Sequence, residues 1–274
     1  MTAQYGQAFR LTLLTDDPAL AAEADDAGVA RIGVDIDRLG KAERQTGLRA
    51  RHSTHVLADL ARLRPVVRRA DLFIRVNPLH SGTPQEVEQA LRLGATAIML
   101  PFFRAATEAE AFIETVRGRA KVLLLVETAT AALRIREIAA LPGIDEIMIG
   151  LNDLRLEFRV PSHFEVLASP MMDMLAREVR SADVKLGIGA LARADSRGLP
   201  VPADLVVAQY PRLGATSAWI ARSFFAAGQP PMPLGRALDD LRARLSHWAA
   251  VEPAVLARAR DEMLAASRAI RAQS

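Results

Sequence analysis

Hydrophobic positions along this chain form short apolar runs that alternate with amphipathic segments. A repeated joint connects them, in which a helical segment ends at a glycine and an apolar or β-branched run follows. The sequence RLGAT occurs twice at such joints, at residues 92–96 and 212–216. Glycine ends a helix at low cost because it adopts the left-handed conformation without a side-chain clash. The pattern therefore predicts repeated helix–strand units.

Nearly continuous apolar runs are typical of parallel strands that are covered on both faces. The predicted strands span residues 10–15, 30–37, 72–77, 97–101, 121–128, 146–152, 185–191 and 217–223. Amphipathic spacing predicts helices between them, for example over residues 84–93, 108–117 and 131–140.

Eight such strands alternating with helices favour an α/β fold, a (β/α)₈ TIM barrel, formed as a single domain by residues 1–274. The alternative is an open doubly wound sheet. However, the first predicted strand runs into Asp16, Asp17 and Pro18 rather than into a glycine-rich phosphate-binding motif.

The C-terminal segment, residues 230–274, contains two further helical patterns, at residues 235–249 and 253–272. One of them supplies the eighth helix of the barrel, and the other is an extra C-terminal helix. A surplus amphipathic helix has an apolar face to cover, so we expect this segment to pack on a neighbouring subunit.

Composition excludes several classes of function. The net charge of only +3 does not favour nucleic-acid binding, and the aromatic content of 5% leaves few side chains on which bases could stack. The absence of cysteine excludes disulfides, thiolate catalysis and cysteine-ligated metal sites. The apolar runs are too short to cross a membrane, and the N-terminus lacks a signal-peptide pattern. We expect a cytoplasmic protein that binds neither nucleic acid nor membrane.

Polar residues with catalytic potential lie where the predicted strands end, and active sites of such barrels lie at the C-terminal ends of the strands. They are Asp37 at the end of the second strand, Arg75 and Asn77 at the end of the third, Glu127 at the end of the fifth, and Asn152 and Asp153 at the end of the sixth. Two carboxylates from adjacent strands suit a hard divalent cation such as Mg²⁺ or Mn²⁺. An arginine beside them offers a planar fork of donors for a carboxylate or enolate oxygen.

Structural roles for the same residues are the alternative. Glu127 and Asp153 each precede a predicted helix and could cap it. Arg75 could be a structural partner of Asp35 in the barrel interior. Lys121 and Lys185 begin their strands, so neither is placed for Schiff-base chemistry at the C-terminal ends.

The segment after the second predicted strand is rich in cations and histidines. It contains Lys41, Arg44, Arg49, Arg51, His52 and His55. Arg44 is a candidate for binding an anionic substrate, and His55 could move a proton because histidine titrates near neutral pH. The alternative is a solvated loop in which Ser53 caps the next helix and His55 lies in the first turn of that helix.

Four segments in order carry a resemblance to a known family. They are residues 74–78 (IRVNP), 97–101 (AIMLP), 125–128 (LVET) and 149–154 (IGLNDL). Over about residues 28–160 the chain resembles the HpcH/HpaI aldolase and citrate lyase β-subunit family, the metal-dependent pyruvate aldolase superfamily. The resemblance implies a (β/α)₈ barrel, a divalent metal bound by Glu127 and Asp153, and contact between Arg75 and a keto-acid substrate. It also implies a homo-oligomer, a trimer or hexamer, with the C-terminal helix exchanged between subunits.

The chain departs from this family after the second strand, where aldolases carry an Asp-Gly-Glu-His run. Residues 35–40 read DIDRLG here and contain no histidine. The acid or base is therefore expected to be His55, Asp37 or a metal-bound water. Arg75, Asn77, Arg44 and Asn152 are the residues expected to bind substrate.

These expectations define a divalent-metal-dependent carbon–carbon lyase, of the class II aldolase type, that acts on a 2-keto acid and forms or uses a pyruvate enolate. Two alternatives remain. One is a citrate-lyase-like acyl-CoA lyase or thioesterase, and the other is a barrel that serves as a non-catalytic binding subunit.

Overall fold

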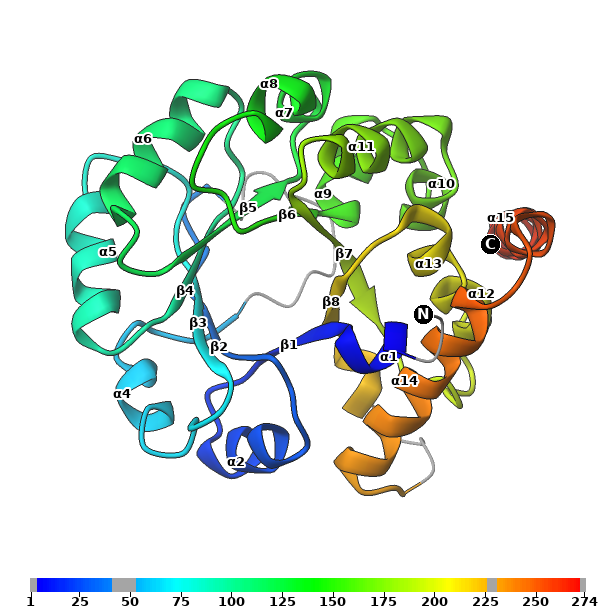
Figure 1. The fold of residues 1–274 in the computed structure, drawn as a ribbon, viewed down its shortest axis with the longest axis horizontal. Helices are drawn as coiled ribbons and strands as arrows, with labels where there is room; N and C mark the ends of the chain where they lie inside the picture. The colour runs from blue at the N-terminus through cyan, green and yellow to red at the C-terminus, as the bar shows by residue number, and fades with distance from the viewer. Residues whose placement is uncertain (1–3, 41–52, 226–230, 272–274) are drawn as a thin grey trace. The chain divides into compact units, whose positions relative to one another are not determined.

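Eight strands follow one another around a closed barrel in the order β1 to β8, so the predicted (β/α)₈ fold is confirmed (Figure 1). This computed structural model describes residues 4–40, 53–225 and 231–271. The strands are β1 (Arg10–Leu14), β2 (Arg31–Asp35), β3 (Asp71–Arg75), β4 (Ala97–Leu100), β5 (Lys121–Val126), β6 (Glu146–Ile149), β7 (Lys185–Leu191) and β8 (Ser217–Ile220). The strand pairs β1–β2, β2–β3, β3–β4, β4–β5 and β7–β8 are parallel.

Several strands are shorter than the sequence predicts, and the difference places the polar residues outside the sheet. β5 ends at Val126 and leaves Glu127 beyond it, while β6 ends at Ile149, so Asp153 lies in a helix. A run of apolar residues does not mark where ladder hydrogen bonding stops, because loop residues beyond a strand can be buried as well.

Helices separate the strands (Figure 1). From the N-terminus to β6 they are α1 (Tyr5–Ala8), α2 (Pro18–Asp26), α4 (Asp59–Leu63), α5 (Thr83–Arg92), α6 (Ala106–Val116), α7 (Ala129–Leu133) and α8 (Ile135–Ala139). After β6 they are α9 (Leu151–Glu157), α10 (His163–Leu167), α11 (Pro170–Ser181), α12 (Ala203–Val207), α13 (Gln209–Leu213), the 3₁₀ helix η2 (Arg222–Phe225), α14 (Leu234–Ala249) and α15 (Pro253–Arg271).

The prediction of one helix over residues 131–140 is wrong, because α7 and α8 meet at Arg134. The backbone N–H of Arg134 donates to Ala131 O, only three residues back. The carbonyl oxygen four residues back, Thr130 O, accepts instead from the side chain of Arg134, whose Nη1 lies 3.3 Å away. Arg134 therefore leaves the helical conformation, at φ −104° and ψ 16°.

The chain divides into two compact units, Thr12–Ile147 and Met1–Leu11 with Met148–Ser274. In the first unit a buried ion pair joins β2 to β6. Arg31 places Nη1 2.8 Å from Glu146 Oε2 and Nη2 2.9 Å from Oε1, while its Nε donates to Thr12 Oγ1 at 2.8 Å. Each of these side chains is almost fully buried, so the charges depend on one another for solvation.

The second unit contains the C-terminal helices predicted over residues 235–249 and 253–272. α14 packs on α1, where a Cβ on Gly6 would lie 1.9 Å from the carbonyl oxygen of Arg242. Only glycine allows this approach. α15 packs on α10, α12 and α13 of the same chain and buries Ala259, Met263 and Ser267 there. Its packing on a neighbouring subunit stays a prediction.

Candidate active site

Asp35 and Arg75 face each other in register at the C-terminal ends of β2 and β3. Arg75 Nε lies 2.7 Å from Asp35 Oδ1, and its Nη2 lies 2.5 Å from Oδ2. Burial by itself would lower the pKa of Arg75. The charge and hydrogen bonds of Asp35, together with the charges of Glu127 and Asp37, outweigh burial and raise that pKa. The guanidinium therefore stays cationic and is held in a fixed orientation by a two-point contact.

Asp37 and Glu127 are buried carboxylates that contribute to the field at Arg75. The backbone N–H of Asp37 donates to Asp35 Oδ1 at 3.1 Å, which holds the chain just past β2. Glu127 follows β5 directly, but Thr128 is the residue that caps α7, with its Oγ1 accepting from Ala131 N. Glu127 is thus not the cap of this helix.

His55 is anchored to the end of β2 by its ring. Its Nδ1 accepts from the backbone N–H of Asp35 at 3.1 Å, so the neutral ring carries its proton on Nε2. That Nε2 lies 3.8 Å from Asp16 Oδ1. Asp16 follows β1 and His55 follows β2, and no periodic pattern in the sequence links the two positions. Sequence reasoning therefore missed Asp16 as a partner of His55.

The expectation that Ser53 caps the next helix, with His55 in its first turn, is wrong. Ser53 Oγ accepts from the N–H of His55 itself, in a tight local turn, and α4 begins only at Asp59. Short serine turns of this kind compete with helix capping for the same hydroxyl. Asp59 Oδ2 instead accepts from Val56 N at 2.8 Å, just before the helix.

The side chain of Asn77 braces two loops. Its Oδ1 accepts from Arg38 N at 3.0 Å and from Leu39 N at 3.1 Å, in the loop after β2. Its Nδ2 donates to Glu86 Oε1 at 2.6 Å, in the first turn of α5. These bonds hold the chain beyond Asp37 against the chain beyond Arg75. Contact between Asn77 and a substrate stays a prediction.

Asn152 and Asp153 belong to the second unit, in the first turn of α9, whose N-cap is Gly150. Asn152 is exposed and Asp153 half-buried. Arg44 lies outside the described residues, as do Lys41, Arg49, Arg51 and His52.

α9 packs on β7 where that strand bulges. Gly189, at φ +33°, lies within the register shift between Gly187 and Ala190 in the pairing with β8, and a Cβ there would lie 2.9 Å from Leu151 Cδ1. The glycine makes room for Leu151, two residues before Asp153.

Carboxylate oxygens are the donors available for a metal. Across residues 4–40, 53–225 and 231–271, no group of three or more His, Cys, Asp or Glu is arranged to hold an ion. Glu127 in the first unit and Asp153 in the second each have the donor chemistry that Mg²⁺ and Mn²⁺ prefer, and their binding of one ion stays a prediction. The donor types therefore fit the implied metal.

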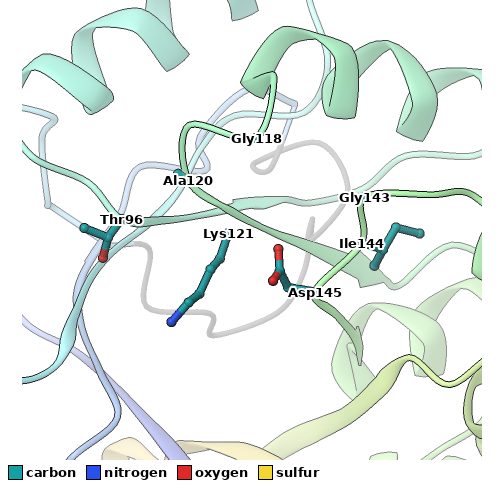
Figure 2. Close-up of a pocket in the computed structure, with 7 residues that line it drawn as sticks. All are labelled: Thr96, Gly118, Ala120, Lys121, Gly143, Ile144 and Asp145. Carbon is teal, nitrogen blue, oxygen red and sulfur yellow. The ribbon is translucent and has the colours of Figure 1, made fainter.

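A cavity at the N-terminal ends of β5 and β6 contains none of the residues predicted for catalysis or metal binding (Figure 2). Its volume is about 450 Å³, and it is lined by Thr96, Gly118, Ala120, Lys121, Gly143, Ile144 and Asp145. Lys121 Nζ is paired with both oxygens of Asp71, at 2.9 and 2.8 Å, and Asp145 Oδ2 accepts from Val122 N. Since Lys121 begins β5, this cavity lies at the strand ends opposite those that carry Arg75 and Glu127.

Known proteins resemble this chain in sequence and in fold. The sequence model described as HpcH/HpaI aldolase/citrate lyase matches residues 42–193. A 2-dehydro-3,6-dideoxy-6-sulfogluconate aldolase of Pseudomonas putida is 33% identical over 103 residues, 27% of this chain. The match spans only 40% of that aldolase.

Two solved structures share the fold at low identity. An HpcH/HpaI aldolase/citrate lyase family protein of Burkholderia cenocepacia superposes with a TM-score of 0.58 at 17% identity, covering 77% of this chain and 87% of that one. The citrate synthase SbnG superposes with a TM-score of 0.60 at 15% identity, covering 82% and 92%. Within the part of the chain that the structure describes, the helices are too short or too polar to span a membrane.

Proposed function

The chain belongs to the HpcH/HpaI aldolase/citrate lyase family, and on that basis we propose that it is a divalent-metal-dependent carbon–carbon lyase acting on a 2-keto acid. The aldolase of Pseudomonas putida supports this reaction class, because the substrate in its name is a 2-keto acid. The observation that carries the proposal is the buried guanidinium of Arg75, which donates two hydrogen bonds to Asp35 and lies in the field of the Glu127 and Asp37 carboxylates.

Each residue then has a defined task. Glu127 and Asp153 would hold Mg²⁺ or Mn²⁺, which acts as a Lewis acid on the keto acid when bound. Arg75 donates hydrogen bonds to the oxygen on which negative charge develops as the enolate forms. Its orientation is set by Asp35 before substrate arrives, so little reorganisation is needed during the reaction.

Proton transfer falls to Asp37 in this proposal. Asp37 removes the proton from the C4 hydroxyl, the C3–C4 bond breaks, and its electron pair passes into the pyruvate enolate while the aldehyde leaves. The same proton returns to C3 and completes pyruvate. His55 stays a candidate for hydrogen bonding to the substrate through its Nε2–H, because its Nδ1 already accepts from Asp35 N–H. Asn77, Asn152 and Arg44 stay candidates for substrate contacts.

Exchange of the pyruvate methyl protons for deuterium tests the proposal without knowledge of the aldehyde. Proton NMR in D₂O should show exchange with Mg²⁺ or Mn²⁺, loss of exchange in excess EDTA, and recovery on adding metal back. Unchanged exchange in EDTA, or none with any divalent ion, would overturn the proposal. Cleavage of an acyl-CoA thioester without pyruvate exchange would favour the acyl-CoA lyase or thioesterase.

We propose in addition that the chain forms a homo-oligomer, a trimer or hexamer. α15 uses one buried face in the packing described above, which leaves Val255 and Arg258 exposed on the same helix. Light scattering at micromolar concentration measures the mass directly, and a monomer would contradict this assignment.

A further inference from the structure

Arg104 lies in the loop between β4 and α6, four residues beyond the end of β4. β4 is the strand between those that carry Arg75 and Glu127. In register, Arg75 pairs with Met99 on one side, and Leu100 pairs with Leu124 of β5 on the other. The loop therefore emerges between two residues of the proposed active site, at the same ends of the strands.

The guanidinium of Arg104 is exposed and rests on the ring of Phe102, with Cζ 4.8 Å from the ring centroid. Among the residues that the structure describes, it has no carboxylate partner. The nearby carboxylate of Glu108 is used otherwise, since Oε2 accepts from the backbone N–H groups of Arg104 and Ala105. By contrast, Arg31 and Arg75 are each paired with an acidic side chain.

The Phe102 ring beneath this cation belongs to a buried turn that neighbouring residues hold in place. Phe102 is buried and adopts φ +52°, a left-handed conformation that costs energy for a residue with a side chain. The next residue is held as well, because Thr128 Oγ1 donates to Phe103 O at 2.7 Å. A guanidinium stacked on an aromatic face keeps its N–H donors in its own plane, where they can bind an oxyanion.

We propose that Arg104 is a specificity-determining residue that binds a second anionic group at the far end of the keto-acid substrate. The inference rests on the proposed function, which places the 2-keto acid at Arg75 and Glu127. The substrate class is then a 2-keto acid whose other end carries a carboxylate, a sulfonate or a phosphate. A cation without an acidic partner favours an anion there over a hydroxyl or alkyl group.

Two keto acids of equal length provide the test. Calorimetry of the Mn²⁺-loaded protein should show that 2-oxoglutarate binds roughly 10- to 100-fold more tightly than 2-oxopentanoate, the effect of one charge-assisted contact. Arg104→Gln should remove the preference, and Arg104→Lys should keep part of it. Arg92→Gln is the matched control, because it removes an exposed arginine from the last turn of α5.

Equal affinities of the wild-type protein for the two acids would overturn the inference, as would an unchanged preference in Arg104→Gln. The proposed function is tested by a different result: it would be overturned if the wild-type protein showed no metal-dependent exchange of the pyruvate methyl protons. Keto acids that end in sulfonate or phosphonate, compared in the same titration, identify which anion Arg104 prefers.

Discussion

Arg75 and Asp35 form a two-point ion pair that is almost completely buried at the ends of two neighbouring strands. The sequence left two roles open for Arg75, a structural partner of Asp35 and a substrate contact. The pairing establishes the first role and is compatible with the second, because a guanidinium has five N–H donors and Asp35 takes up only part of them.

The two roles separate in a double mutant. Arg75→Ala should lower the free energy of unfolding by about 3–5 kcal/mol, because it leaves the carboxylate of Asp35 buried without its partner. Arg75→Ala with Asp35→Ala should recover part of that loss, since the stranded charge is gone. Pyruvate exchange should fall by roughly two to three orders of magnitude in both proteins, the effect of losing one donor to a developing negative charge.

Urea unfolding and proton NMR exchange on the same samples check this prediction. Arg75→Lys should restore little activity, because an ammonium cannot reproduce the planar fork. A double mutant that is stable and fully active would show that Arg75 serves the fold alone.

Glu127→Gln tests the proposed metal ligand. The fold should survive, because the two side chains have nearly the same shape. Affinity for Mn²⁺ should fall by at least about 100-fold, since a direct ligand matters more than the outer-shell partners whose loss costs 10- to 100-fold. Equilibrium dialysis measures the affinity, with Glu137→Gln on the exposed surface of α8 as the control. Equal Mn²⁺ affinity in the two variants would remove Glu127 from the proposed site.

The sequence was a good guide to the barrel and to the strand ends, because both depend on local patterns. Apolar runs located all the strands, and the polar residues after them included Arg75, Asp37 and Glu127. Contacts between distant loops were not predictable. Neither Glu86, which binds Asn77 from the next helix, nor the Phe102 platform of Arg104 follows a periodic pattern. The break between α7 and α8 was missed as well, because no glycine or proline marks Arg134, where the two helices meet.

Gly189→Ala should destabilise the protein more than glycine replacement at positive φ normally does. The conformation alone costs about 1–2 kcal/mol, and the added Cβ would also press on Leu151 at 2.9 Å. Gly198→Ala is the control, because Gly198 has φ +70° but no atom within 4 Å of the place that an added methyl group would take. Urea midpoints compare the two variants, and equal losses would show that α9 shifts without cost.

His163 makes stability depend on pH. Burial, with a smaller effect of Arg155, lowers the pKa of His163 from 6.5 to about 4. The unfolded chain therefore takes up a proton more readily than the folded one, so this contribution to stability is complete above pH 6.5 and is lost as pH falls toward 4. By pH 5 the loss should be about 1–2 kcal/mol.

Urea unfolding at pH 7 and pH 5 measures the loss, and His163→Gln should reduce it. The variant retains a polar side chain after Ser162, whose hydroxyl caps α10. An identical pH dependence in the variant would assign the acid sensitivity to carboxylates elsewhere.

The Arg31–Glu146 pair has a consequence for the order of folding. The two residues are 115 positions apart in the sequence. The pair therefore forms only after β2 and β6 have been brought close by assembly of the strands between them. Until then, each charge must remain hydrated, so water cannot leave the interior around Arg31 and Glu146. A partly assembled barrel lacks this pair and would leave either charge without its partner if it buried it, which favours cooperative assembly of residues 12–147.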